Sequence, residues 1–202
     1  MGTVGGDKEE GEMSELVART GRLQQRYQHG CRLVAGCIPF RYRSSSEHDG
    51  STDDEVVEVL MINSNSGRGL LFPKGGWEND ETVKEAAIRE AIEEAGVKGE
   101  IMGELGCYNF KSKTLQDEHC PEGLCKAEMF ALLVKEELRS WPEQSTRQRT
   151  WLTVPEALNN CRHEWMHRAL KEGFIKWHAN FVSESANREG RGVSSSPESP
   201  SA

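Results

Sequence analysis

The sequence contains no hydrophobic run that approaches the ~18 residues needed for a membrane-spanning helix. It also lacks the apolar segment of a secretory signal peptide, and its six cysteines do not follow the pattern of a small disulfide-rich secreted domain. Basic residues are in the minority, with 25 Lys and Arg against 33 Asp and Glu and a formal net charge of -8. This balance disfavours a dedicated DNA-binding protein. We therefore expect a reduced, intracellular, soluble protein with neither a DNA nor a membrane partner.

The content of hydrophobic residues is sufficient for the core of one domain. The chain has 202 residues, 36% of them hydrophobic, which fits a single domain with tails at ~150 residues per domain. Residues 1–17 are Gly-rich and acidic, and residues 183–202 are rich in Ser and Pro. We expect both ends to be disordered tails around a domain that spans residues 18–182.

The acidic residues are concentrated in a few segments. Residues 1–15 carry five acidic residues and one Lys, and residues 75–97 carry seven acidic and two basic residues. Outside these segments and the C-terminal tail, the chain is slightly basic. The acidity therefore belongs to one tail and to one segment of the domain, and the remaining surface suits a polyanionic ligand.

The hydrophobic pattern predicts a mixed α/β or α+β domain. A helix is expected from Asp80, as its N-cap, to Ala95, with Gly96 as its C-terminal stop. Two further helices are expected over residues 154–160 and 163–178. Strands are expected over residues 31–43, 55–63, 70–73, 101–112, 125–135 and 148–152, and residues 74–80 are expected to form a Gly-bearing loop.

The first of these helices has two chemically different faces on a helical wheel. Carboxylates at Glu90, Glu93 and Glu94 converge on one side at a like-charge cost, so the cluster favours an external cation. All-oxygen ligation suits Mg²⁺ or Mn²⁺, with Ca²⁺ as an alternative. The other reading is an acidic helix surface in solvent. The opposite side, which is expected to pack on a sheet, carries Ala87, Ile88, Ala91, Ile92 and Ala95.

The loop before this helix decides between the two readings. Gly75 and Gly76 allow a tight turn and a close approach to a ligand. The spacing Gly75-x5-Glu81-x7-Arg89-Glu90-Ala91-x-Glu93-Glu94-x-Gly96-Val97 resembles the Nudix box, G-x5-E-x7-R-E-U-x-E-E-x-G-U. Every fixed letter matches over the whole motif. The one soft departure is Ala91, where a larger aliphatic residue is usual.

The resemblance implies a hydrolase of diphosphates linked to a second group, folded as an α/β/α sandwich around a mixed β-sheet with a loop-helix-loop catalytic motif. Glu90, Glu93 and Glu94 would be the metal ligands for Mg²⁺, with Mn²⁺ as a substitute. Glu81 would assist from the loop, and Arg89 would orient the glutamates by ion pairing. Water would attack phosphorus, with one glutamate of the cluster as general base; the box does not identify which one.

Segments outside the box, among them RTGRLQQRY, FPKGGWENDE and WPEQSTRQRTWLTVPEAL, look like plant Nudix hydrolases. That branch is similar to diphosphoinositol polyphosphate phosphohydrolases and diadenosine polyphosphate hydrolases. One departure is Lys74, where the diphosphoinositol group typically has a third Gly. The alternative functions are a pyrophosphatase for dinucleotides, nucleotide sugars or mRNA caps, and a non-catalytic module that senses a nucleotide or an inositol phosphate.

A small polyphosphate substrate needs cations around the pocket, and the sequence leans towards a highly anionic one. Arg147 and Arg149 share a strand face and could contact either a phosphate or solvent. A nucleotide would instead use an aromatic platform such as Tyr27 or Trp77. The residues expected to bind substrate are Arg32, Arg41, Arg43, Lys74, Gly75, Gly76 and Lys111.

The acidic N-terminus predicts a location in the cytoplasm, the nucleus or both, because organelle transit peptides are typically rich in Arg. The mitochondrion is the alternative, since plant relatives include organellar members. The sequence carries no indication of an oligomeric state.

Overall fold

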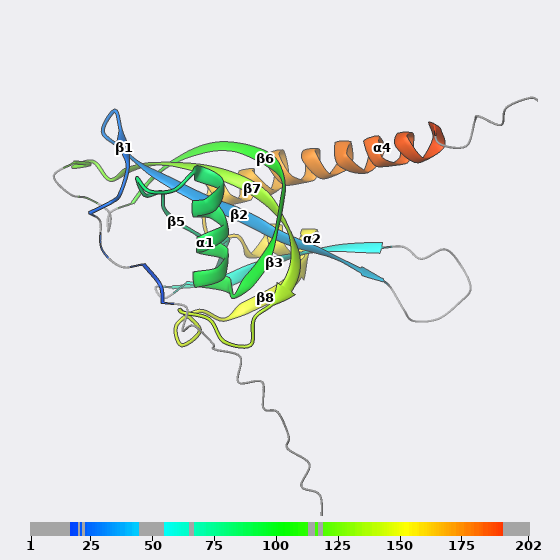
Figure 1. Cartoon of the computed structure of the whole chain (residues 1–202), viewed down its shortest axis with the longest axis horizontal. Coiled ribbons are helices and arrows are strands. Elements are labelled where there is room, and N and C mark those ends of the chain that lie inside the picture. The colour runs from blue at the N-terminus through cyan, green and yellow to red at the C-terminus, as the bar shows by residue number, and fades with distance from the viewer. Residues whose placement is uncertain are drawn as a thin grey trace, which may run out of the picture.

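The computed structural model describes residues 17–19, 21, 23–44, 55–64, 67–112, 116 and 119–191 (Figure 1). Nearly all of the expected N-terminal tail therefore lies outside the described residues, as does the end of the C-terminal one. Within the described part of the chain, no helix is long and apolar enough to cross a membrane.

A mixed β-sheet forms the centre of the domain. Its main path runs β4-β3-β2-β7-β6, and the short strands β1 and β5 pair with β2 while β8 pairs with β3. β2 and β7 run parallel, from Arg32 beside Cys125 to Phe40 beside Leu133, and the other paired strands are antiparallel. The bounds are β1 Tyr27–Gln28, β2 Cys31–Ser44, β3 Glu55–Asn63, β4 Leu70–Leu71, β5 Lys74–Gly76, β6 Val97–Lys111, β7 Leu124–Glu137 and β8 Arg149–Thr153.

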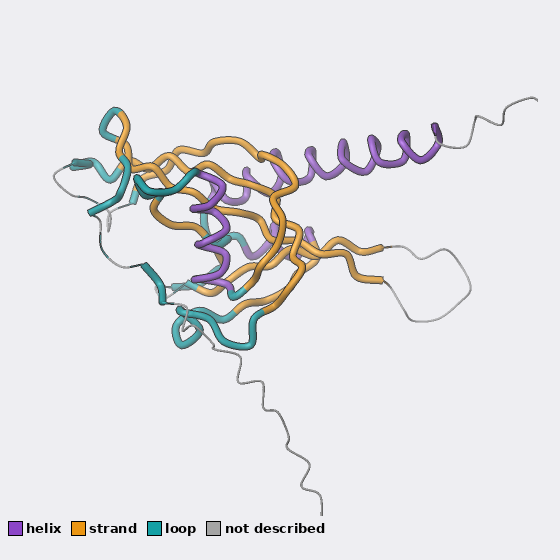
Figure 2. Tube along the Cα trace, in the orientation of Figure 1, coloured by secondary structure: helices purple, strands orange, loops and turns teal. Residues whose placement is uncertain are grey.

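Helices cover both faces of this sheet (Figure 2). Helix α1 (Val83–Ala95) packs on the face that carries Cys37 of β2, where burial and then the charges of Glu94 and Glu90 raise the pKa of the Cys37 thiol. Phe40 lies on the opposite face, because side chains alternate along a strand, and its ring is 5.4 Å from that of Phe174. The expected α/β/α sandwich is confirmed. The other helices are α2 Val154–Asn160, α3 Glu164–Arg168, the π-helical segment η2 Ala169–Phe174 and α4 Ile175–Arg191.

Helix α1 begins later than predicted. Thr82 is its N-cap: the hydroxyl accepts a hydrogen bond from the Glu85 backbone N–H, and the Glu85 carboxylate accepts one from Thr82 N–H. This reciprocal pair is a capping box. Asp80 was the wrong N-cap, because its carboxylate binds the Arg19 guanidinium at 3.0 Å instead. Gly96 ends the helix as predicted, in the left-handed conformation with φ 62°.

The last helical region extends further than predicted. Helix α4 continues to Arg191 and projects beyond the sheet (Figure 1), whereas the disordered tail was expected to begin at residue 183. Within the helix, the ring of Trp177 stacks on that of Phe181 at 5.3 Å. The hydroxyls of Ser183 and Ser185 donate to carbonyls four residues earlier, so these Ser residues remain compatible with a helix.

Candidate active site on the loop and helix α1

The loop before α1 lies against the helix because its first residues form a strand. Lys74–Gly76 pairs with β2, with Gly75 beside Ala35, although the sequence suggested an irregular loop. A Cβ atom at Gly75 would lie 2.1 Å from Glu90 Oε1. No side chain fits at residue 75 while the Glu90 carboxylate stays where it is. A glycine is therefore required here because of the limited space, and its backbone conformation does not require one.

The three clustered carboxylates are buried. Glu90, Glu93 and Glu94 expose 8%, 7% and 6% of their surfaces, so they do not form the solvated face that the wheel left open as an alternative. Ile88 and Ile92, expected to pack on the sheet, are half-buried, and of the two Ile88 packs against the core. Together with Val17 and Pro142, they line an apolar cavity of about 250 Å³ on the outer side of α1. The small side chains Ala86, Ala87, Ala91 and Ala95 make the contact with the core.

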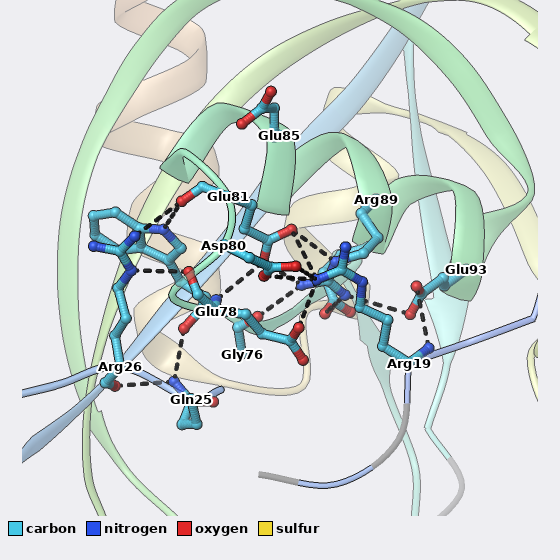
Figure 3. Close-up of polar contacts among 12 residues, drawn as sticks. Arg19, Gln25, Arg26, Gly76, Glu78, Asp80, Glu81, Glu85, Arg89 and Glu93 are labelled. Carbon is cyan, nitrogen blue, oxygen red and sulfur yellow. Dashed lines mark hydrogen bonds and ion pairs between the residues drawn. The ribbon is translucent and has the colours of Figure 1, made fainter. Parts of the chain in front are cut away.

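Arg89 connects the loop to the helix (Figure 3). Its guanidinium makes two hydrogen bonds to Glu81, at 2.8 and 2.9 Å, and one to Glu90 at 2.7 Å. It also donates to Gly76 O at 2.8 Å and lies 3.4 Å from Glu93 Oε2. Burial opposes the charge of Arg89, but these carboxylates outweigh it and raise its pKa. The ion pairing expected of Arg89 is present.

Glu94 is held by two donors from outside the helix. Lys74 N–H donates to Glu94 Oε2 at 2.7 Å, and Arg147 Nη2 donates to Glu94 Oε1 at 2.9 Å. Despite these partners, burial raises the pKa of Glu94. Burial and then the nearby charge of Glu94 raise the pKa of Glu90 to about 8. The carboxylates are thus held close together at an electrostatic cost that a cation would relieve.

The donor chemistry of this cluster fits a hard divalent cation, because it consists of buried carboxylate oxygens that repel one another. As arranged among the described residues, no three His, Cys, Asp or Glu side chains form a ready metal cage. Instead, the guanidinium groups of Arg89 and Arg147 hold the carboxylates. A divalent ion bound here would therefore compete with these guanidinium groups for the carboxylate oxygens.

The chain before β1 also reaches the site. Arg19 Nη1 pairs with Glu78 at 2.6 Å and with Asp80 at 3.0 Å, and Arg19 N–H donates to Glu93 Oε1 at 3.3 Å. Nothing in the sequence indicated this contact, because Arg19 is 59 residues away from Glu78. The segment before β1 thus contacts Glu93, one of the three clustered carboxylates.

The structure does not bring all predicted substrate cations to the carboxylates. Arg41 and Arg43 both pair with Glu58, which is consistent with their expected common face, and the Arg41 guanidinium also covers the Trp151 ring at 4.0 Å. They lie at the end of β2 away from Gly36, which pairs with Lys74. Their role in substrate binding stays a prediction that none of these contacts supports.

Two other predicted cations lie nearer to the loop or on its flank. Arg32 Nε donates to Gln25 Oε1 at 2.6 Å, and its Nη2 atom would be 2.9 Å from a Cβ at Gly76. Lys111, at the end of β6, is exposed and lies 3.5 Å from Glu122. Arg32, Lys74, Gly75 and Gly76 are therefore grouped around the loop, whereas Lys111 is on the surface.

Arg149 has a structural role at the other end of α1. Its guanidinium donates to the carbonyls of Ala95 and Gly96 and lies over the Trp141 ring at 4.4 Å. The last turn of α1 has no basic residue of its own, so Arg149 supplies the cation favoured at a helix C-terminus. Their alternation in the sequence placed Arg147 and Arg149 on one strand face. Only the tertiary structure shows that Arg147 binds the Glu94 carboxylate, whereas Arg149 caps the C-terminus of α1.

Comparisons with known proteins agree with this geometry. The family model described as "NUDIX domain" matches residues 50–177. The chain is 68% identical over 166 residues to "Nudix hydrolase 16, mitochondrial" from Arabidopsis thaliana, covering 82% of this chain and 92% of the relative. It is 54% identical to "Nudix hydrolase 13, mitochondrial" from the same plant, covering 79% and 82%. A crystal structure of a C. elegans Ap4A hydrolase complex superposes with a TM-score of 0.50 at 17% identity, covering 73% of this chain and 98% of that one.

Proposed function

This chain belongs to the Nudix hydrolase family, and we propose that it is a Mg²⁺-dependent pyrophosphatase, with Mn²⁺ as a substitute, that acts on diphosphoinositol polyphosphates, diadenosine polyphosphates or both. One observation carries the proposal. Glu90, Glu93 and Glu94 form a cluster of three buried carboxylates, in which Glu90 lies against Gly75 and the Arg89 and Arg147 guanidinium groups pair with Glu90 and Glu94.

Each residue would contribute to hydrolysis in a specific way. Glu90, Glu93 and Glu94 would hold the divalent ions, which when bound lower the pKa of water and neutralise charge on phosphoryl oxygens. A carboxylate of this cluster would accept the proton of the attacking water. Glu81 would fix Arg89, to which it is joined by two hydrogen bonds. Gly75 would leave room beside Glu90, Gly76 would leave room beside Gln25 and Arg32, and Lys74 would add a cation at the loop.

Two observations support the proposed substrate class: the chemistry next to the carboxylates and the plant branch that the sequence resembles. Cleavage of a diphosphate bond is assisted by metal ions, which these glutamates could bind, and by cations that hold the remaining phosphates. Arg32 and Lys74 would supply such cations at the loop. Nudix enzymes act on small molecules, which matches this expectation. No described contact favours the inositol or the adenosine class over the other, so the proposal retains both.

A substrate panel tests this function. The purified full chain with Mg²⁺ is incubated with a diphosphoinositol pentakisphosphate, diadenosine hexaphosphate, ADP-ribose and NADH, and the products are separated by anion-exchange chromatography. We expect turnover of at least one of the first two, its loss with EDTA, and ¹⁸O from labelled water in a phosphate product. Turnover of ADP-ribose or NADH alone would contradict the substrate class. Tight binding of any of the four without turnover would indicate a sensing module.

We also propose a mitochondrial location. Two relatives carry this compartment in their names, and the comparisons give no support to the cytoplasm or nucleus. A fluorescent protein fused to the C-terminus of the full chain, expressed in Arabidopsis thaliana cells, should coincide with a mitochondrial dye. A diffuse cytoplasmic and nuclear signal would contradict the proposal.

A further inference from the structure

A short segment before β1 runs alongside the loop that precedes α1. Arg26 N–H donates to Trp77 O at 2.9 Å, and Asn79 N–H donates to Gln24 O at 2.8 Å. Between them, Gln25 and Glu78 form an isolated antiparallel bridge. The Gln25 side chain, which is buried, donates to Trp77 O at 3.2 Å and to Leu33 O at 2.8 Å. The loop is therefore paired with another part of the chain along its length.

The Arg26 side chain binds three carbonyls of this loop, and Figure 3 shows the contacts with Glu78 and Glu81. Nε donates to Glu78 O at 2.8 Å, and Nη2 donates to Asn79 O at 2.8 Å and to Glu81 O at 3.1 Å. The guanidinium carbon lies 4.6 Å from the centre of the Trp77 ring, whose own N–H donates to Glu81 O at 3.0 Å. A planar guanidinium can span these acceptors, whereas a Lys ammonium is a point charge without that fork.

The loop in turn fixes the side chain that orients Arg89. Glu81 Oε1 accepts the Glu78 N–H at 3.0 Å and Arg89 Nη2 at 2.8 Å. Arg89 then contacts Glu90 and Glu93. Arg26 is thus connected to the carboxylates through Glu81 and Arg89, and it does not itself contact them.

We propose that Arg26 is a positioning residue of the active site: it holds the carbonyls of the loop so that Glu81 and Arg89 keep the metal-binding carboxylates in place. The inference rests on the proposed function of Glu90, Glu93 and Glu94 as metal ligands. Groups that act through the ligands typically change metal affinity or activity by about 10- to 100-fold.

A different role for Arg26 makes a different prediction. Arg26 also lines a cavity of about 640 Å³ with Tyr27, Trp77 and Lys126, where a cation could instead bind a phosphate of the substrate. In that case Arg26→Lys, which keeps the charge, would preserve function, and loss of the charge would raise KM without changing metal affinity. The positioning role requires the fork, so Arg26→Lys should behave nearly as Arg26→Ala.

The experiment measures Mn²⁺ binding to the metal-free full chain by electron paramagnetic resonance, together with melting temperature, kcat and KM. The variants are Arg26→Lys and Arg26→Ala, with Lys98→Ala as a control, since Lys98 is an exposed base on β6 paired with Glu136 at 3.4 Å. We expect both Arg26 variants to bind Mn²⁺ about 10- to 100-fold more weakly, with kcat lowered more than KM is raised. Lys98→Ala should match the parent.

Arg26→Lys decides the outcome even where Arg26→Ala fails to fold. A folded Arg26→Lys protein with weakened Mn²⁺ affinity supports the positioning role, and parental affinity in it overturns that role. The parent is compared with Glu93→Gln in the same assay. If the two bind Mn²⁺ equally, the assignment of the carboxylates as metal ligands fails, whereas parental binding in Arg26→Lys alone rejects only the inference on Arg26.

Discussion

Glu90→Gln is expected to lower turnover by more than about a hundredfold while making the metal-free protein more stable. The activity falls because an amide is a weak ligand for Mg²⁺ and the substitution removes a charge from the proposed metal cluster; even groups behind the ligands typically account for up to ~100-fold. Stability rises because Glu90 is 8% exposed and lies near the Glu94 charge. A neutral amide of the same shape removes both the burial of charge and the repulsion.

The gain in stability should grow with pH. The folded state holds the pKa of Glu90 at about 8, above its ordinary value of 4.5, so between these values the folded protein retains a proton that the unfolded chain releases. The free energy of unfolding of the parent therefore falls as the pH rises through this window. Glu93 and Glu94 contribute with the same sign, since burial raises the pKa of each. Because Gln does not titrate, Glu90→Gln lacks the part of this pH-dependent destabilisation that Glu90 causes in the parent.

Calorimetric melting of the metal-free parent and Glu90→Gln near pH 5 and pH 8 checks the sign, and turnover of the preferred substrate checks the activity. We expect the melting temperature of the variant to exceed that of the parent by roughly 5 °C near pH 8 and by less near pH 5. Glu136→Gln, an exposed glutamate on β7 that pairs with Lys98, should change neither property. Parental turnover in Glu90→Gln, or a lower melting temperature near pH 8, would contradict the role assigned to this carboxylate.

The parts of the site that were predicted from the sequence are those encoded locally. The box residues lie within one loop and one helix, so their spacing along the chain determines their neighbours in space. This is why the convergence of Glu90, Glu93 and Glu94 and the stop at Gly96 could be anticipated from the residues themselves. The ion pairing of Arg89 was implied by the resemblance to the Nudix box. The positions of strands β2 and β3 were also predicted within a residue, because their apolar runs have no helical period.

The parts that were missed depend on contacts between distant segments. A helical wheel separates acidic and apolar faces but does not show which of them meets the sheet, so it could not show that Glu94 is buried while Ile92 lines an outer cavity. The contact between Arg147 and Glu94 spans 53 residues, and the contact between Arg26 and Glu78 spans 52. Neither partner carries a local signal for the other.

Counting basic residues was incomplete for a related reason. Arg41 and Arg43, which were expected to serve a polyanionic substrate, are both paired with Glu58, and their role in substrate binding stays a prediction. A basic residue identifies a possible ligand site only when its own acidic and carbonyl neighbours are known. Of the cations predicted to bind substrate, Arg32 and Lys74 are the ones that the described structure places at the loop.

Gly75→Ala is expected to reduce kcat/KM by more than about a hundredfold. Its effect on the free energy of unfolding should be smaller than its effect on the activation free energy. The added Cβ would lie 2.1 to 2.3 Å from the carboxylate atoms of Glu90. The backbone at Gly75 is outside the left-handed region, so Ala is tolerated there except for this contact. The Glu90 side chain must therefore move, which takes a carboxylate of the proposed metal cluster away from Arg89 and from its neighbours.

Glu90→Asp in the Gly75→Ala background tests this mechanism. Shortening the side chain by one methylene makes room for the new Cβ, so the double variant should melt above Gly75→Ala, although the shorter carboxylate should leave turnover low. The two substitutions should be non-additive, as contacting residues are, by on the order of 1 kcal/mol. Gly76→Ala is the matched control, because its Cβ would meet Gln25 Oε1 at 2.1 Å instead. Glu90→Asp should not relieve that contact, and equal rescue of both glycine variants would contradict a specific collision between position 75 and Glu90.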